Sequence, residues 1–152
     1  MRFVSTRGVS PPVTFSQALL QGLSPDGGLY VPTEWPGLSQ AAPGPLPQLG
    51  SELIGAFAEG DALASLVPAI TQDAFDFPAP LKTLPSSGLR VLELFHGPTA
   101  AFKDFGARFL AASLARIARP SGRTLRILVA TSGDTGGAVA AAFHRRSGME
   151  VV

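Results

Sequence analysis

The second half of the chain alternates between short apolar runs and longer helix-forming segments. Residues 89–95, 125–130 and 149–152 have the composition of strands, while 99–119 carry apolar side chains at helical spacing and 138–146 are rich in alanine. This strand–helix–strand–helix–strand order is typical of a parallel sheet with crossover helices. We therefore predict an α/β fold. Because a parallel sheet needs cover on both faces and usually more strands, we expect 89–152 to be only the beginning of a domain, and the chain to be a fragment.

The first half contains shorter elements separated by many turns. Thr14 and Gln17 have the spacing of a capping box, which predicts a helix through Leu20 that ends at Gly22. A turn at 24–28 leads into a short apolar stretch at 29–31, and 36–50 has the composition of a loop. Helices are expected at 51–59, at 61–66 and from Pro68 to residue 75. The extended segment 77–80 indicates a boundary, so we predict domains at 1–88 and 89–152.

Bulk composition narrows the classes of function. The chain has 152 residues and a net charge of +1, which provides no electrostatic reason for binding nucleic acid or an anionic membrane. It contains no cysteine, so disulfides and thiolate metal sites are excluded. No segment resembles a secretory signal or reaches the ~18 apolar residues of a membrane span. We expect a cytoplasmic protein that acts on a small molecule; its oligomeric state is not readable from the sequence.

Two turns rich in small residues, 96–99 and 131–137, lie where a strand passes into a helix. Such turns expose backbone N–H groups at the positive end of a helix, where a phosphate or carboxylate can bind. Neither turn has the Walker-type Gly-Lys-Ser/Thr, the G-x-G-x-x-G dinucleotide spacing or a G-x-S-x-G nucleophile. For 131–137, a plain connection without a ligand is the commoner alternative.

Lys103 is the most informative single residue. It is one of two lysines in a chain that otherwise uses ten arginines, and it lies between Phe102 and Phe105 at the start of a predicted helix. A lysine in apolar surroundings can lose its proton and attack a carbonyl, whereas arginine cannot. Without its neighbours, however, Lys103 would most often be a solvated helix residue.

The remaining candidate residues allow less specific readings. Asp104 and Arg108 could form an ordinary i,i+4 pair on a helix face. His96 reads as a turn or hydrogen-bonding residue and His144 as a surface residue at a helix end. The two histidines do not have a metal-binding spacing, so no metal site is predicted.

Several motifs together resemble the threonine synthases of the longer, bacterial- and fungal-type branch. The run HGPTAAFKDFG at 96–106 is similar to that family's cofactor-lysine motif, and TSGDTG at 131–136 is similar to its second motif. The N-terminal half agrees through STRG at 5–8, ALLQGL at 18–23 and PDGGLYVP at 25–32, and FPAPL at 77–81 also fits. Dehydratases and cysteine synthases of the same fold carry Ser-x-Lys-x-Arg and Gly-Asn instead, which favours threonine synthase.

The resemblance implies a fold and a chemistry. It implies a small N-terminal α+β domain followed by the start of the parallel-sheet domain of tryptophan-synthase-β-like (fold type II) pyridoxal-phosphate enzymes, here truncated. The implied reaction is that of a carbon–oxygen lyase: O-phospho-L-homoserine and water give L-threonine and phosphate, in threonine biosynthesis.

By the same resemblance, each candidate residue receives a role. Lys103 would bind pyridoxal 5′-phosphate covalently and act as acid and base, and Phe102 would pack beside the cofactor. Thr131, Ser132 and Thr135 match the turn that would hold the substrate carboxylate. Asp134 stands near the cofactor's ring oxygen where relatives have Asn, so its contact would differ from that of an amide.

The resemblance also sets a limit. The family's chains are several hundred residues long, and their loop for the cofactor phosphate and their partner for the pyridine nitrogen are expected beyond Val152. We therefore expect the 152-residue chain to be inactive alone. Two alternatives stay open: a threonine-synthase-like phospholyase that yields a keto acid, and an inactive remnant that serves as an interaction module.

Overall fold

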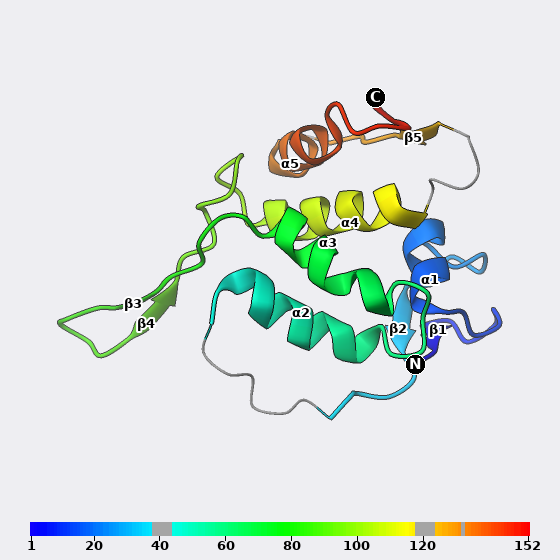
Figure 1. Cartoon of the computed structure of the whole chain (residues 1–152), viewed down its shortest axis with the longest axis horizontal. Coiled ribbons are helices and arrows are strands. Elements are labelled where there is room, and N and C mark those ends of the chain that lie inside the picture. The colour runs from blue at the N-terminus through cyan, green and yellow to red at the C-terminus, as the bar shows by residue number, and fades with distance from the viewer. Residues whose placement is uncertain (38–43, 118–123, 132) are drawn as a thin grey trace. The chain divides into compact units, whose positions relative to one another are not determined.

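The structure, a computed structural model, describes residues 1–37, 44–117, 124–131 and 133–152. The chain forms two compact units, residues 1–72 and 73–152 (Figure 1). Helix α3, Val67–Ala74, contains the point at which one unit gives way to the next. Among the described residues, no helix has both the length and the apolar character needed to cross a bilayer.

The first unit begins with a two-stranded antiparallel sheet. Strand β1, Phe3–Ser5, pairs with β2, Tyr30–Pro32, and the register places Val4 opposite Val31. Helix α1, Phe15–Gln21, follows Thr14, whose side chain accepts a hydrogen bond from the Gln17 backbone while the Gln17 side chain accepts one from the Thr14 N–H. This reciprocal pair confirms the predicted capping box, and Gly22 ends the helix as predicted.

The helical part of the first unit differs from the prediction. Helix α2 runs over Leu46–Phe57, so it begins inside the stretch expected to be a loop, because a proline near its start suits the first helical turn. Residues 38–43 of that stretch lie outside the described residues. The helix expected at 61–66 is only a 3₁₀ turn, η1, Ala64–Leu66. Just before it, the Asp61 carboxylate accepts from the Leu63 N–H. The next helix, α3, confirms the expected helix near Pro68.

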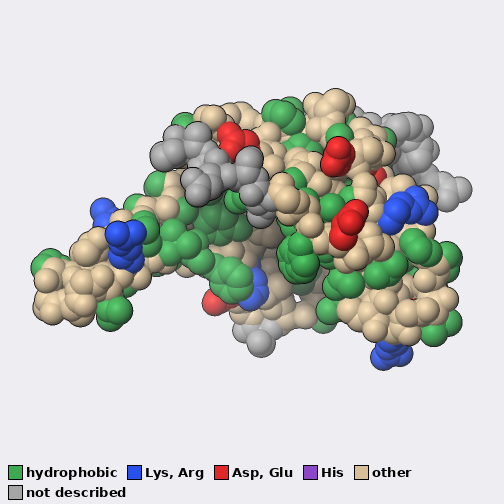
Figure 2. All heavy atoms as spheres, turned by 90° about the horizontal axis from the view of Figure 1, so that it is seen from below, with side chains coloured by type: hydrophobic (Ala, Val, Ile, Leu, Met, Phe, Trp, Pro, Cys, Tyr) green, Lys and Arg blue, Asp and Glu red, His purple; other side chains and the backbone are tan. Residues whose placement is uncertain are grey.

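The second unit contains a hairpin that the sequence did not predict. Strand β3, Leu81–Thr83, pairs antiparallel with β4, Arg90–Leu92. The run 89–95 was expected to join a parallel sheet, and that expectation is wrong for the described residues, where β4 pairs only with β3. Its apolar side chains are exposed, and hydrophobic and basic side chains reach the surface of this hairpin at the left of Figure 2.

Two helices and two short strands make up the core of the second unit. Strands β5, Leu125–Ile127, and β6, Met149–Val151, pair in parallel, as the strand–helix–strand pattern predicts. Helix α4, Lys103–Ile117, packs along α5, Asp134–Phe143 (Figure 1). Their buried faces form one cluster with the strands: Ala107, Ala111, Leu114, Ala138, Ala142 and Phe143.

Both helices start elsewhere than predicted. Helix α4 begins four residues after Thr99, because residues 97–101 form a separate turn, and the expected end at Arg119 lies outside the described residues. Helix α5 begins at Asp134 rather than at Ala138, so its two glycines lie inside the helix, and it ends at Phe143 rather than Arg146. His144 caps α5 and is exposed, as predicted.

One carboxylate joins the ends of two helices and the segment that follows α5. Asp73, near the end of α3, accepts hydrogen bonds from two nitrogens of Arg146, at 3.0 and 3.1 Å, and from Arg116 at 3.2 Å. Arg116 lies in the last turn of α4, where its charge also suits the helix dipole. Hydrogen bonding and charge from Arg146, and then from Arg116, hold the pKa of Asp73 below its usual value.

Candidate functional site

The segment before α4 is a tight turn held by the side chain of Asp104. The Asp104 carboxylate accepts from the Thr99 N–H at 2.9 Å and from the Thr99 hydroxyl at 2.8 Å. Within the turn, the Ala100 N–H donates to the Gly97 carbonyl, and Ala100 has a left-handed φ of 56°. Asp104 is fully buried. Its partner is therefore Thr99, and the alternative of a surface pair with Arg108 is wrong.

Arg108 has different partners. Its guanidinium donates to the backbone carbonyls of Asp73 and Ala74 and to the carboxylate of Asp76, at 2.7–2.9 Å. Beside it, Phe77 lies edge-on to Phe105, with ring centroids 4.9 Å apart. These contacts fasten the first half of α4 to the end of α3 and to the segment that follows it. The contacts of Arg108 and Phe105 thereby fix the position of the helix that carries Lys103.

Lys103 is the first residue of α4 and is partly buried. Its ammonium nitrogen lies 3.9 Å from the centre of the Phe102 ring, while Phe102 itself is exposed. An aromatic face attracts the ammonium and also shields one side of it from water. Lys103 and Phe102 thus lie in contact, and the expectation that Phe102 packs beside a cofactor stays a prediction.

The second turn is organised by Thr131. Its hydroxyl oxygen accepts from the Gly133 N–H at 3.3 Å and from the Gly136 N–H at 3.2 Å, which leads the chain into α5. Ser132, a predicted substrate-binding residue, lies outside the described residues. Asp134 and Thr135 form the first turn of α5 and are exposed. Among the predicted residues of this turn that the structure describes, Thr135 alone lines the pocket described next.

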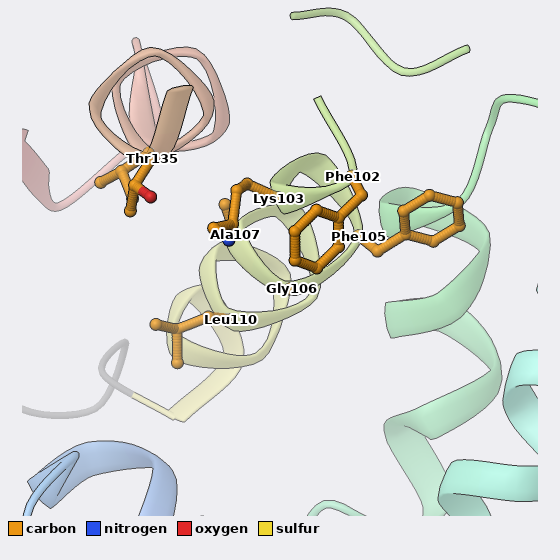
Figure 3. Close-up of a pocket in the computed structure, with 8 residues that line it drawn as sticks. Phe102, Lys103, Phe105, Gly106, Ala107, Leu110 and Thr135 are labelled. Carbon is orange, nitrogen blue, oxygen red and sulfur yellow. The ribbon is translucent and has the colours of Figure 1, made fainter. Parts of the chain in front are cut away.

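A pocket of about 300 Å³ lies between α4 and α5. Figure 3 shows Lys103, Ala107 and Leu110 along one side of α4, with Thr135 contributed by α5. The full lining is Phe102, Lys103, Phe105, Gly106, Ala107, Leu110, Thr135 and Val139. The two sequence motifs therefore meet at one cavity, whose walls are mostly apolar apart from an amine and a hydroxyl.

Most of the pocket's apolar residues were not predicted as site residues. Residues 106, 107 and 110 follow Lys103 at spacings of three, four and seven, which places them on one helix face with it. That spacing is the signal that could have found them. Val139 has no such signal, because its place depends on how α5 packs on α4. Asp134 and Thr131, although predicted, do not line the pocket.

The surrounding polar groups give no indication of a metal. His96 and Glu93 are hydrogen bonded to each other at 2.7 Å, which agrees with the reading of His96 as a hydrogen-bond partner. No cluster of three metal-ligating side chains occurs in the described part of the chain.

The residues present suit a flat, carbonyl-bearing cofactor such as pyridoxal phosphate. A primary amine on the pocket wall can bond to a carbonyl carbon, the Phe102 ring offers a flat contact, and the mostly apolar lining can pack against a ring. The hydroxyl of Thr135 supplies a hydrogen-bond donor from the other helix. Such a site can therefore hold a reactive aldehyde near a group able to carry a proton.

Comparison with known proteins points to one family. A family model described as Threonine synthase N terminus matches residues 2–75. The Haemophilus influenzae threonine synthase is 46% identical over 143 residues, an alignment covering 92% of this chain and 33% of that protein. The Escherichia coli enzyme is 38% identical over the whole of this chain and 36% of its own length. The chain belongs to the threonine synthase family.

Solved structures of this family agree with the fold. The crystal structure of the threonine synthase from Brucella melitensis, which is described as PLP bound, superposes with a TM-score of 0.89 at 36% identity. That match covers 99% of this chain and 34% of the Brucella chain. The yeast threonine synthase matches with a TM-score of 0.86 at 25% identity. This chain thus spans about a third of the length of the threonine synthases that it matches.

Proposed function

We propose that this chain supplies the lysine side of the active site in a pyridoxal-phosphate-dependent threonine synthase. The overall reaction is O-phospho-L-homoserine plus water to L-threonine plus phosphate. The observation that carries the proposal is that Lys103 and Thr135, from the two family motifs, line one pocket between α4 and α5. The similarity to threonine synthases over 92–100% of the chain supports it.

The roles proposed for the chain's residues come from the family resemblance. Lys103 would hold the cofactor through its neutral amine nitrogen and, once displaced by the substrate amine, would act as base and acid at Cα and Cβ. The cofactor supplies an electron sink for the pair that remains when the Cα proton leaves. In the overall change, phosphate departs from Cγ, Cβ gives up a proton and Cγ gains one, and water adds at Cβ, its second proton leaving with the phosphate. Phe102 keeps one side of the Lys103 amine apolar.

The second turn is proposed to bind the substrate carboxylate through the N-terminal end of α5. Thr135 offers a hydroxyl at the pocket, and the family motif adds Thr131 and Ser132 as further candidates. The Thr131 hydroxyl accepts from two backbone N–H groups, so its part is to shape the turn as well as to donate to a ligand. Asp134, where the family pattern has an amide, is proposed to lie near the cofactor ring oxygen.

The proposal also covers the domain assignment, the cellular location and the kind of partner. We assign residues 1–88 to the family's N-terminal domain and 89–152 to the start of a fold type II catalytic domain. We expect the protein in the cytoplasm, with a small-molecule substrate and no nucleic-acid partner.

The test compares the two lysines in the complete gene product. With pyridoxal phosphate, the protein should show the visible absorbance of a lysine-bound cofactor, which Lys103→Ala abolishes and Lys82→Ala retains. Lys82 lies on β3 and provides the matched control. An unchanged spectrum in Lys103→Ala would overturn the proposal.

Product analysis then fixes the reaction. Threonine and phosphate in equal amounts from O-phosphohomoserine support the proposal, and a keto acid would replace it with a phospholyase. The 152-residue chain by itself should release no threonine under the same conditions. Measurable turnover by that chain would show that residues 1–152 suffice for the site.

A further inference from the structure

Asp104 is a fully buried carboxylate directly beside the lysine of the pocket. It makes no contact with the pocket and has no ion pair within the part of the chain that the structure describes. Its two oxygens are used instead by one residue, Thr99, through the backbone N–H and the hydroxyl. Burying a charge without a cationic partner is costly, so these hydrogen bonds hold Asp104 in one position.

The turn before α4 leaves space for the Asp104 side chain only because residue 97 is glycine. A Cβ atom on Gly97 would lie 2.4 Å from one carboxylate oxygen and 2.7 Å from the Asp104 Cβ, so a side chain at Gly97 cannot be accommodated without moving Asp104. The Asp104 N–H donates to the Ala101 carbonyl. The carboxylate, the turn and the first residues of α4 therefore form one closed unit.

We propose that Asp104 is the positioning residue for Lys103. The two are neighbours in the first turn of α4, so the contact between Asp104 and Thr99 sets where the helix starts and how the Lys103 backbone is oriented. This orientation directs the amine toward the side of α4 that faces Thr135 (Figure 3). The inference rests on the proposed function, because it concerns the delivery of the Lys103 amine to the cofactor.

A purely stabilising role is the alternative, since a carboxylate in the first turn also interacts favourably with the helix dipole. That role would lower the stability of every variant without changing which lysine reacts. The two roles are separated by a ratio measured within one molecule, namely the reaction of Lys103 relative to that of Lys82 with the same aldehyde.

The experiment treats the complete gene product with limiting pyridoxal phosphate, reduces it with borohydride and quantifies both lysines by peptide mass spectrometry. In the unaltered protein, modification should favour Lys103. Asp104→Asn should lower the Lys103 to Lys82 ratio at least about tenfold, because one Thr99 donor then faces an amide NH₂. Thr99→Val, which removes only the hydroxyl, should lower it about threefold or more, and Thr99→Ser should restore it.

One control variant and one fallback comparison separate the positioning role from a loss of stability. Ala111→Gly weakens the same helix two turns downstream and should leave the ratio within twofold of the unaltered protein. A loss in Ala111→Gly equal to that in Asp104→Asn would overturn the positioning role, as would unchanged ratios in both Asp104→Asn and Thr99→Val. If Asp104→Asn does not fold, the comparison of Thr99→Val with Thr99→Ser decides. No preference for Lys103 in the unaltered protein would instead refute the proposed function itself.

Discussion

Two neighbouring glycines in the first turn of α5 should respond oppositely to alanine. A Cβ atom on Gly136 would lie 1.9 Å from the Cγ2 atom of Thr131 and 3.2 Å from its Cβ, whereas a Cβ atom on Gly137 would meet nothing within 4 Å. Both positions are helical. We therefore predict that Gly136→Ala destabilises the chain and that Gly137→Ala stabilises it.

The magnitude follows from what Thr131 must give up. If its side chain rotates away, the hydroxyl leaves the N–H groups of Gly133 and Gly136, at about 0.5–1.5 kcal/mol for each hydrogen bond. If α5 shifts instead, overpacking costs about 1–3 kcal/mol. Alanine is the better helix former by about 1 kcal/mol, which offsets part of the loss. The net expectation is a loss of about 1–3 kcal/mol for Gly136→Ala and a gain of up to about 1 kcal/mol for Gly137→Ala.

Urea unfolding of the 152-residue chain, followed by circular dichroism, measures both changes. The cause is tested by repeating Gly136→Ala in a Thr131→Ser background, which removes the clashing methyl group and retains the hydroxyl. The cost of the alanine should then fall by at least half, a coupling that a double-mutant cycle quantifies. Equal effects of alanine at both glycines, or no coupling to Thr131, would refute the reasoning.

Two further predictions concern the interior of the second unit. Ser113 is fully buried, and its hydroxyl has no hydrogen-bond partner among the described residues, so Ser113→Ala should raise the free energy of unfolding by about 1 kcal/mol in the same assay. Asp73→Asn should lower it by about 1–2 kcal/mol at pH 7, since the partly exposed carboxylate binds Arg146 and Arg116. The pKa of Asp73 in the folded chain is below 3.8, so this contribution is present above pH 3.8 and is lost as the pH falls through the pKa of the folded state. At such low pH, the urea midpoints of Asp73→Asn and the unaltered chain should converge.

Two features were predicted correctly, the N-terminal capping box and the parallel pair of strands. The capping box of Thr14 and Gln17 closes over three residues, and Gly22 ends the helix one turn later. The pairing of β5 with β6 follows from the strand–helix–strand order, because a crossover helix favours a parallel neighbour. Lys103 and Thr135, from the two sequence motifs, line one pocket, although in the described residues β4 pairs with β3 and does not join the sheet of β5 and β6.

Other features depended on contacts between distant segments. The run 89–95 has strand composition, but composition alone does not determine which strand pairs with it. The turn after β3 brings β3 and β4 together, so they form a hairpin. The partner of Arg108 is likewise set by the segment after α3, 32 residues away, rather than by its own helix.

The sequence by itself determined the family, the candidate lysine and the two turns that flank its pocket, because these are carried by residue identity and short spacing. Only the tertiary structure decided what Asp104 does. On the sequence, it reads as one half of a surface pair with Arg108. In the fold, burial removes it from water, and a buried carboxylate must take the donors within reach, which are the N–H and hydroxyl of Thr99. The residue next to the lysine thereby becomes part of how that lysine is held.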